Sequence, residues 1–439
     1  MSKEAVTWTP EQSRVIVSRG ENLLVSAAAG SGKTAVLVER IIRMVTEGEH
    51  PLDIDRLLVM TFTNAAASEM RERIGAAIEK KLREEPENEH LQIQSTLIHH
   101  AQITTIDSFC LKVIREHFHL LDLDPSFRIG DEGELLLLRG DVMRELLEDR
   151  YAGGSESFFR FVETYAQGKS DAGIEDYILQ VYTFAQSNPY PAQWISRCRD
   201  ELCAGAGGRG PWMDFLLTDL KKQAGELAAQ LEDALMICRG DDFLCAYEPM
   251  LEHDIRQLET ILGVSDLAEL CGALSSISWD RLATVRSKEV DQEQKAYVTG
   301  CRDRVKKAVG KMRELYCFAE PEEMLADMEG AREAVGVLLD LAEEFSDRFR
   351  EKKRERNLVD FNDLEHEALK VLIREEEGKT VYTEAADELS AEFEQVLVDE
   401  YQDSNLVQEA LLNAVSGERF GRHNVFMAVS YTHLRAHET

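Results

Sequence analysis

The sequence has no apolar run approaching the roughly 18 residues that a membrane-spanning helix needs. Its first residues, MSKEAVTWTPEQ, lack the apolar core and the small-residue cleavage site of a signal peptide. The eight cysteines include no C-x-x-C pair, which disfavours a zinc or iron–sulfur site and favours free thiols in a reducing compartment. We therefore expect a cytoplasmic protein that does not enter a membrane.

Positive charge is also scarce, because 50 basic residues face 82 acidic ones and the formal net charge is −32. Nonspecific coating of nucleic acid depends on attraction to phosphates, so this composition argues against it. A DNA channel built locally from backbone amides, aromatic rings and a few cations remains compatible with the charge. Hydrophobic residues make up 44% of the 439 residues, enough for two or three domains with their own cores.

Short apolar runs alternate with stretches of helical periodicity near both ends of the sequence. Strands are predicted at residues 22–29, 57–62, 103–107, 394–401 and 424–429. Helices are predicted at residues 34–46, 64–83 and 108–120. Strands that alternate with helices in this way predict an α/β fold with a parallel sheet.

The middle of the sequence has a different character. From residue 131 to 355, strand signals nearly disappear and helical periodicity dominates, so we expect a large, mostly helical insertion. Three prolines and four glycines gather at 187–211, which predicts a loop or hinge there. The α/β domain then consists of residues 1–130 and 356–429. Residues 430–439 continue no pattern, and we expect a non-native tail from a truncated reading frame.

A phosphate-binding loop is predicted where the first strand meets the first helix, because backbone amides in such a loop cradle phosphate oxygens. The residues expected to bind the nucleotide are Ala27, Ala28, Ala29, Gly30, Ser31, Gly32, Lys33 and Thr34. Lys33 is expected to reach the β- and γ-phosphates of ATP, and the Thr34 hydroxyl to bind Mg²⁺. Ala27 replaces the usual first glycine, and a Gly-rich turn without a ligand is the alternative.

Two adjacent carboxylates end the strand predicted at 394–401. Asp399 is expected to hold Mg²⁺ through its water shell, and Glu400 to act as the general base for the attacking water. The alternative is an acidic strand end that only caps a helix. Since Lys33 and Asp399 lie so far apart in the sequence, we predict that the insertion separates two halves of one ATP site.

These motifs and three others resemble superfamily 1 helicases of the UvrD/Rep type, and specifically the AddA family of helicase–nuclease subunits related to RecB. The segment TPEQ at 9–12 resembles the Q motif, which implies that Gln12 reads the adenine edge. Residues 61–73 resemble motif Ia and residues 104–110 resemble motif Ib. The run LVDFNDL at 358–364 is typical of the same branch, and we expect its two aspartates, Asp360 and Asp363, to cap a helix.

The resemblance implies that motifs Ia and Ib contact single-stranded DNA. The implied residues are Phe62, Thr63, Asn64, Thr105, Ser108 and Phe109. Phe62 would stack on a base, while Thr63 and Asn64 would bind phosphates without adding positive charge. The alternative for motif Ia is a strand end followed by an N-capped helix, and both roles are compatible. Asp107 is expected to cap the helix after motif Ib.

The resemblance further implies an ATP- and Mg²⁺-dependent 3′→5′ DNA helicase with exonuclease activity. Such a protein acts on single- and double-stranded DNA with an AddB-like partner in double-strand break repair and recombination. The family continues G-D-x-K-Q-S-I-Y after the last strand, whereas this sequence continues Ser430-Tyr431-Thr432-His433. We therefore expect a fragment that binds ATP weakly and hydrolyses it poorly or not at all on its own. A UvrD-like repair helicase without nuclease and a non-catalytic ATP- or DNA-binding module are the alternatives.

Overall fold

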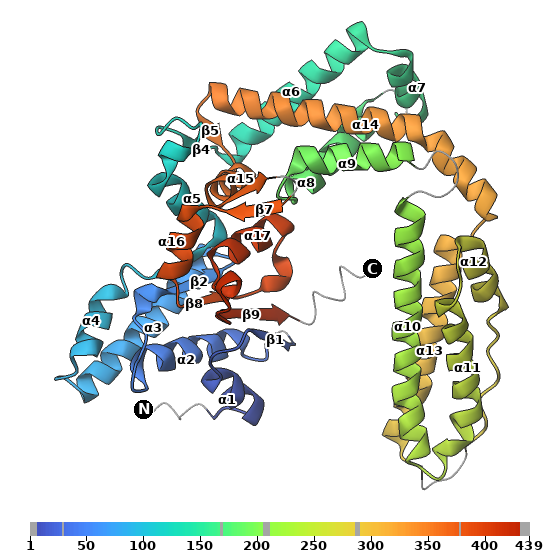
Figure 1. Cartoon of the computed structure of the whole chain (residues 1–439), viewed down its shortest axis with the longest axis horizontal. Coiled ribbons are helices and arrows are strands. Elements are labelled where there is room, and N and C mark those ends of the chain that lie inside the picture. Colours follow the sequence, from blue (N-terminus) through green and yellow to red (C-terminus); the bar gives the residue numbers. More distant parts are fainter. Residues whose placement is uncertain are drawn as a thin grey trace. The chain divides into compact units, whose positions relative to one another are not determined.

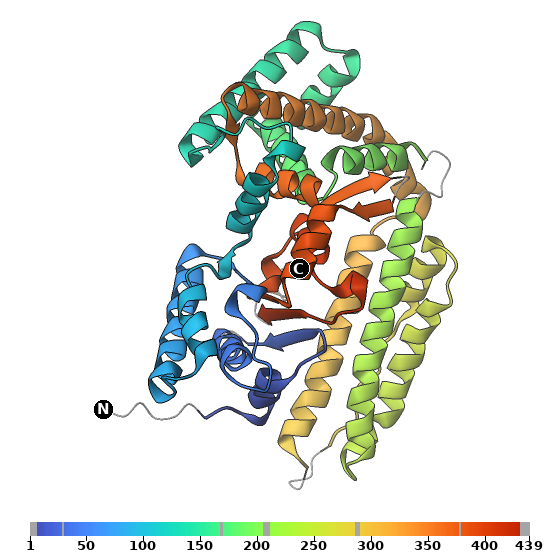
Figure 2. The same cartoon turned by 60° about the vertical axis from the view of Figure 1, so that its left-hand side comes forward.

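The computed structural model describes residues 7–28, 30–166, 170–204, 211–285, 290–376 and 379–430. The chain divides into two compact units, shown from two directions in Figures 1 and 2. The first unit comprises residues 1–149, 178–192 and 342–439, and the second comprises residues 150–177 and 193–341. Within the described ranges, every helix is too short or too polar for a bilayer crossing.

A five-stranded, entirely parallel sheet forms the centre of the first unit. Its strands, in spatial order, are β1 (Leu23–Ala27), β9 (Val425–Ser430), β8 (Gln395–Val398), β2 (Leu57–Thr61) and β3 (Gln102–Thr105). Because all strands run the same way, their carboxyl ends lie along one edge of the sheet, where α/β folds bind their ligands. The predicted α/β fold with a parallel sheet is confirmed.

Helices cover both faces of this sheet. Those of the first unit are α1 (Pro10–Val17), α2 (Lys33–Thr46), α3 (Asn64–Glu84), α4 (Glu89–Leu97), α5 (Ile106–Glu116), most of α6 (Glu132–Gly153), the end of α8 (Ala172–Gln186), the end of α14 (Pro321–Glu355), α15 (Phe361–Leu372), α16 (Glu384–Glu392) and α17 (Leu406–Val415). One core joins α2 and α3 to one set of strand residues, including Val59 and Leu397. A second core joins α5, α15, α16 and α17 to the alternate residues, including Met60 and Val398. Both faces of the sheet are therefore buried except at the edge strand β1, where Leu24 is 63% exposed, which explains the apolar character of β2, β8 and β9.

Short elements complete the first unit. They are η1 (Ile54–Arg56), η2 (Phe118–Leu120), η4 (Tyr401–Asp403) and η5 (Glu418–Phe420), a parallel pair of β4 (Arg128–Ile129) with β5 (Leu358–Val359), and an antiparallel pair of β6 (Ile373–Glu376) with β7 (Lys379–Tyr382). The pair β6–β7 was not predicted from the sequence. Of the expected tail at 430–439, only Ser430 is described, as the last residue of β9.

The DFNDL segment begins α15 with a reciprocal capping box. The Asp360 side chain accepts a hydrogen bond from the backbone of Asp363, and the Asp363 side chain accepts one from the backbone of Asp360. This confirms the capping role predicted for both residues. Lys353 lies between them, with its Nζ 2.7 Å from Asp360 Oδ2 and 2.6 Å from Asp363 Oδ2. The Lys353 side chain is only 3% exposed, so this is a buried ionic cluster.

All the regular elements described in the second unit are helices, and residues 277–285 form an extended connection without regular structure. The unit contains α7 (Glu156–Tyr165), the start of α8 (Ala172–Gln186), most of α9 (Pro191–Ala204), α10 (Pro211–Arg239), η3 (Leu244–Tyr247), α11 (Glu248–Leu262), α12 (Leu267–Ser276), α13 (Gln292–Tyr316) and part of α14 (Pro321–Glu355). The helical character predicted for residues 131–355 is confirmed, since the elements described there are all helices. The predicted loop at 187–211 is a turn at 187–190 followed by α9, and residues 205–210 lie outside the described ranges.

A buried ion pair and a partly buried disulfide hold this second unit together besides its apolar core. Arg302 binds Asp254 through two nitrogens, with Nε 2.5 Å from Oδ2, and Arg302 also donates to the Asp280 carbonyl at 2.9 Å. A disulfide joins Cys271 on α12 to Cys317 after α13. The expectation of free thiols throughout was therefore wrong for these two cysteines. They are 46 positions apart, and only the packing of α12 against α13 brings them together.

Candidate functional site

The loop between β1 and α2 has the backbone shape of an anion cradle. Gly30 and Gly32 have φ values of +78° and +86°, a left-handed conformation that residues with a Cβ rarely adopt. A Cβ on Gly30 would meet nothing within 4 Å, so its requirement is conformational and not steric. Gly32 is the N-cap of α2 and contributes no side chain, which leaves the first amides of the helix available to an anion.

Lys33 is the first residue of α2 and folds back over this loop. Its Nζ donates to the carbonyl oxygens of Ala27 at 3.1 Å and Ala28 at 3.3 Å. Its ammonium group therefore lies beside the strand end that the sequence analysis assigned to phosphate binding. Ala29, also expected to bind the nucleotide, lies outside the described residues.

Thr34 and Asp399 meet across the sheet edge, although the helical insertion separates them in the sequence. The Thr34 hydroxyl donates to Asp399 Oδ2 at 3.0 Å. Asp399 is 8% exposed, and its other oxygen, Oδ1, is buried without a hydrogen-bond partner in the described structure. Burial raises the pKa of Asp399, and the bond from Thr34 opposes that rise. An unsatisfied carboxylate oxygen beside a hydroxyl fits the hard oxygen ligands that Mg²⁺ prefers.

Glu400 occupies a strained position directly after β8. Its φ is +59° and its ψ is 45°, which places a residue with a long side chain in the left-handed region. Gln402 Nε2 donates to Glu400 Oε2 at 2.5 Å, and Gln402 Oε1 accepts from the backbone N–H of Ser430 at 2.9 Å. Sequence reasoning missed Gln402. The sequence signal for Gln402 was an amide side chain two residues after the acidic pair of Asp399 and Glu400.

Gln12 connects α1 to the phosphate loop. Thr9 caps α1, and the Gln12 side chain completes a capping box by accepting from the Thr9 backbone N–H at 2.9 Å. The same amide donates from Nε2 to the Ser31 carbonyl at 3.1 Å. The side chain expected to read adenine therefore lies against the loop expected to hold the phosphates.

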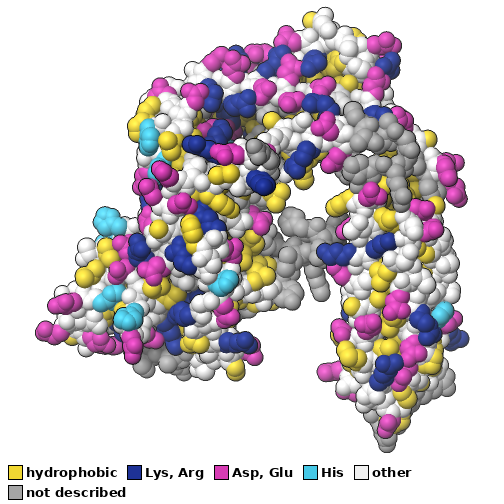
Figure 3. Space-filling view, in the orientation of Figure 1, with side chains coloured by type: hydrophobic (Ala, Val, Ile, Leu, Met, Phe, Trp, Pro, Cys, Tyr) yellow, Lys and Arg dark blue, Asp and Glu magenta, His cyan; other side chains and the backbone are white. Residues whose placement is uncertain are grey.

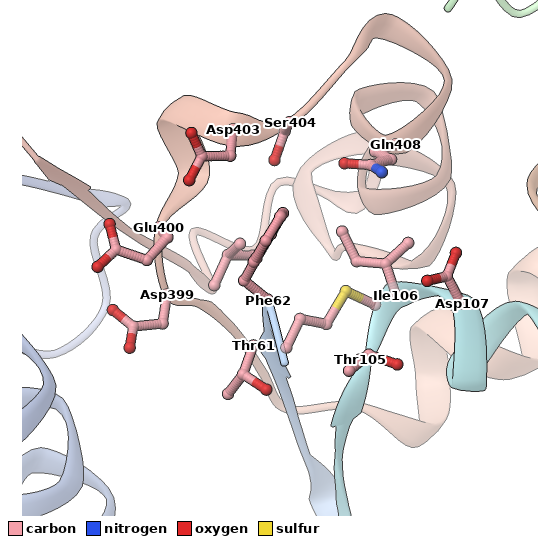
Figure 4. Close-up of a pocket in the computed structure, with 12 residues that line it drawn as sticks. Thr61, Phe62, Thr105, Ile106, Asp107, Asp399, Glu400, Asp403, Ser404 and Gln408 are labelled. Atoms are coloured by element: carbon pink, nitrogen blue, oxygen red, sulfur yellow. The ribbon is translucent and has the colours of Figure 1, made fainter. Parts of the chain in front are cut away.

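A cavity of about 140 Å³ lies at the carboxyl ends of β2, β3 and β8, and Figure 4 draws the residues that line it. Its walls are Met60, Thr61, Phe62, Thr105, Ile106, Asp107, Val398, Asp399, Glu400, Asp403, Ser404 and Gln408. The cavity thus brings residues of motifs Ia and Ib together with the two carboxylates of the expected ATP site. The Phe62 side chain is 70% exposed, so its ring is open to a ligand.

Two threonines that were expected to contact DNA cap helices at this edge. Thr63 caps α3 by accepting from the Ala66 N–H at 3.1 Å, and Asn64 is the first residue of that helix. Thr105 caps α5 by accepting from the Ser108 N–H at 3.3 Å, and it donates to Ser108 Oγ at 2.9 Å. The cap of α5 is therefore Thr105, and the expectation that Asp107 caps this helix was wrong.

Phe109 does not lie where the sequence analysis expected it. Its ring is 1% exposed and packs edge-on against Phe393, with 6.2 Å between ring centroids. It belongs to the core on one face of the sheet, so it does not face a DNA strand. The apolar spacing of Phe109, Cys110, Val113 and Ile114 was the signal for this buried face.

A parallel sheet with a glycine-rich loop, a lysine and a threonine after its first strand, and an acidic pair after another strand defines a P-loop nucleotide-binding domain. Comparison with known families gives a closer relationship. Residues 8–429 match the family described as UvrD/REP helicase N-terminal domain, and the chain belongs to that family.

Curated relatives include three bacterial proteins, each named as one subunit of an ATP-dependent helicase/nuclease. The protein from Lachnoclostridium phytofermentans is 48% identical over 96% of this chain and 31% of its own length. Those from Clostridium perfringens (strain SM101) and Clostridium botulinum (strain Alaska E43) are 44% and 41% identical, each over 96% of this chain and 34% of their own length. The chain therefore spans about a third of the length of these relatives.

Proposed function

We propose that this chain is the ATP-binding part of an ATP-dependent 3′→5′ DNA helicase–nuclease that acts in double-strand break repair and recombination. The observation that carries the proposal is the contact between Thr34 and Asp399, 3.0 Å across the sheet edge, with an unsatisfied carboxylate oxygen beside it. In this proposal residues 1–130 and 356–429 form helicase domain 1A, and residues 131–355 form the inserted domain 1B. The names and the family of the relatives support this assignment.

Each residue of the proposed nucleotide site has a separate role. Amides of residues 27–34 and the Lys33 ammonium bind the phosphates of ATP, and Gln12 contacts the base. Thr34 and Asp399 hold Mg²⁺, which when bound neutralises phosphate charge. Glu400 accepts the proton of the attacking water, and the amide of Gln402 orients its carboxylate at 2.5 Å.

The DNA site uses the same sheet edge. The exposed Phe62 ring stacks on a base, which tolerates any sequence because every base has a π-face. The phosphates of the DNA strand lie along Thr63, Asn64, Thr105 and Ser108. Thr105 gives its hydroxyl hydrogen to Ser108, so Ser108 is the hydroxyl of this pair that donates to phosphate. Figure 3 shows acidic and basic side chains interspersed on the visible face, which fits a grip made by local contacts.

The wider assignments follow from the relatives. Their names describe one component of a larger enzyme, which supports a second component, and we propose an AddB-like partner. Substrates that contain both single- and double-stranded DNA fit a helicase that also carries a nuclease. We propose a cytoplasmic location, where the chromosome of a bacterium lies.

Titration calorimetry of the purified chain with Mg²⁺ and a nonhydrolysable ATP analogue tests the nucleotide site. We expect the wild-type chain to bind, and Lys33→Ala to weaken binding by at least about tenfold, because a charge-assisted bond contributes roughly 1.5–3 kcal/mol. Lys80→Ala, on the exposed surface of α3, is the matched control and should bind as wild type does. A wild-type chain that fails to bind, or a Lys33→Ala variant that binds equally well, refutes the site.

A further inference from the structure

A buried glutamate that the proposed chemistry does not use connects two helices of the first unit. Glu365 on α15 is 4% exposed. Its Oε1 accepts from Gln408 Nε2 at 2.6 Å, and its Oε2 accepts from Asn405 Nδ2 at 3.3 Å. Asn405 is the N-cap of α17 and accepts from the backbone N–H of Gln408 at 2.8 Å. The carboxylate is therefore bound to the first turn of α17, where the helix dipole also favours negative charge.

The charge of Glu365 also affects two ionisable side chains at the start of α5. Burial and then the Glu365 carboxylate raise the pKa of Asp107 to about 6. Burial, and then both carboxylates, raise the pKa of Cys110, about one turn along α5. Asp403 and Glu400, from the segment after β8, share the cavity with Asp107. Within the described residues, no ion pair includes Asp107 or Glu365, so a cation does not offset this repulsion.

These contacts join the two halves of the proposed site. The segment from Asp399 to Ser404 leads directly into α17, and α5 follows the motif Ib strand, β3. Figure 4 shows Gln408 and Asp107 on neighbouring walls of the cavity. Glu365 therefore ties the cap of α17, which follows the Glu400 segment, to α15, and α15 packs against α5 in one apolar core.

We propose that Glu365 is a positioning residue that couples the nucleotide site to the DNA site by tying the first turn of α17 to α15, which packs against α5. This inference rests on the proposed function. It assigns Glu365 no contact with ATP or DNA. The pKa of Asp107 provides a readout of Glu365, because it depends on the charge of the Glu365 side chain.

The coupling is measured as a ratio of affinities. The Kd of the chain for a fluorescein-labelled oligothymidylate is determined by anisotropy with and without Mg²⁺ and a nonhydrolysable ATP analogue. We expect the two Kd values of the wild-type chain to differ by about fivefold or more, as allosteric coupling typically does. Glu365→Gln should bring the ratio close to one while each ligand still binds. Glu367→Gln is the matched control, because Glu367 is also buried on α15 but binds Lys370 at 2.6 Å.

A second readout is independent of both ligands. Ionised Asp107 is disfavoured in the folded state, so Asp107→Asn should raise Tm near pH 7.5. Its effect should be much smaller near pH 4, where Asp107 is protonated in the folded state and only about half ionised in the unfolded chain. This gain should shrink in a Glu365→Gln background, because the repelling charge is gone. If Glu365→Gln does not fold, Gln408→Leu removes one donor to Glu365 and should lower the coupling ratio.

The possible outcomes distinguish failure of the role of Glu365 from failure of the proposed function. Unchanged coupling in Glu365→Gln or Gln408→Leu, with both ligands bound, overturns the role of Glu365 and leaves the proposed function intact. Equal loss of coupling in Glu367→Gln also overturns it, because the effect is then a general consequence of altering α15. A wild-type chain that binds neither ligand refutes the proposed function itself, and the inference with it.

Discussion

Replacing Lys353 by methionine tests how the first unit tolerates an uncompensated buried charge. Lys353 lies 2.6–2.7 Å from two carboxylates, those of Asp360 and Asp363. The Lys353 and Asp360 side chains are 3% and 9% exposed, so solvent screens them little. Removing one partner of a buried ion pair costs about 3–5 kcal/mol, because the remaining charge stays desolvated. We expect a loss of this size in the unfolding free energy of the first unit.

Hydrogen exchange followed by mass spectrometry resolves this loss within one unit. A penalty of about 3–5 kcal/mol corresponds to roughly two to three and a half powers of ten in the protection of α15 amides. Peptides from α11 in the second unit provide an internal control and should keep their protection.

A compensated variant completes the test. In Lys353→Met/Asp360→Asn/Asp363→Asn the carboxylate charges are gone, and asparagine still caps a helix well. We expect this triple variant to recover most of the lost protection. Two results would contradict the explanation by desolvated charge. One is a Lys353→Met variant whose α15 amides lose less than about tenfold in protection, and the other is a triple variant whose α15 amides are no better protected than those of Lys353→Met.

Three further predictions concern single contacts. Phe62→Ala should weaken oligothymidylate binding by roughly 1–3 kcal/mol with an unchanged Tm, whereas Phe109→Ala should cost about 3–5 kcal/mol of stability in urea unfolding. Burial and the Glu365 carboxylate raise the pKa of Asp107 from its ordinary 3.8 to about 6 in the folded state. The ionisation of Asp107 therefore lowers the stability of the protein as pH rises from about 4 to 6, and Asp107→Asn should flatten that part of the Tm–pH profile. Asp254→Asn should destabilise the second unit by about 3–5 kcal/mol, seen as faster exchange in α11 and α13, because Arg302 keeps a buried charge.

The strands could be predicted because each is a short apolar run ending in a chemically distinctive residue. The runs at 57–62 and 424–429 coincide closely with β2 and β9, and the acidic pair follows β8 as expected. Local rules also gave the capping role of Asp360 and Asp363, since a side chain three residues from its partner needs no tertiary information.

Contacts between distant segments could not be predicted in the same way. The strand order, the ion pairs of Lys353 and the disulfide between Cys271 and Cys317 depend on packing that no local pattern encodes. Phe109 was misplaced because a resemblance to motif Ib outweighed its position on the apolar face of α5. Gln402 and Glu365 were overlooked because their importance arises only from partners that the fold brings near.

The strand order also constrains how the protein is made on the ribosome. Strands β2 and β3 emerge early and pair with each other, but β1 pairs only with β9, and β8 lies between β2 and β9. At roughly 5–20 residues per second, the interval from residue 105 to residue 395 lasts on the order of tens of seconds. During that interval the apolar strand β2 lacks one neighbour and β1 lacks its sole partner in the described sheet. All residues of the helical second unit are synthesised before β8 and β9, so its core can form while the strand edges of the sheet are still unpaired and prone to aggregation.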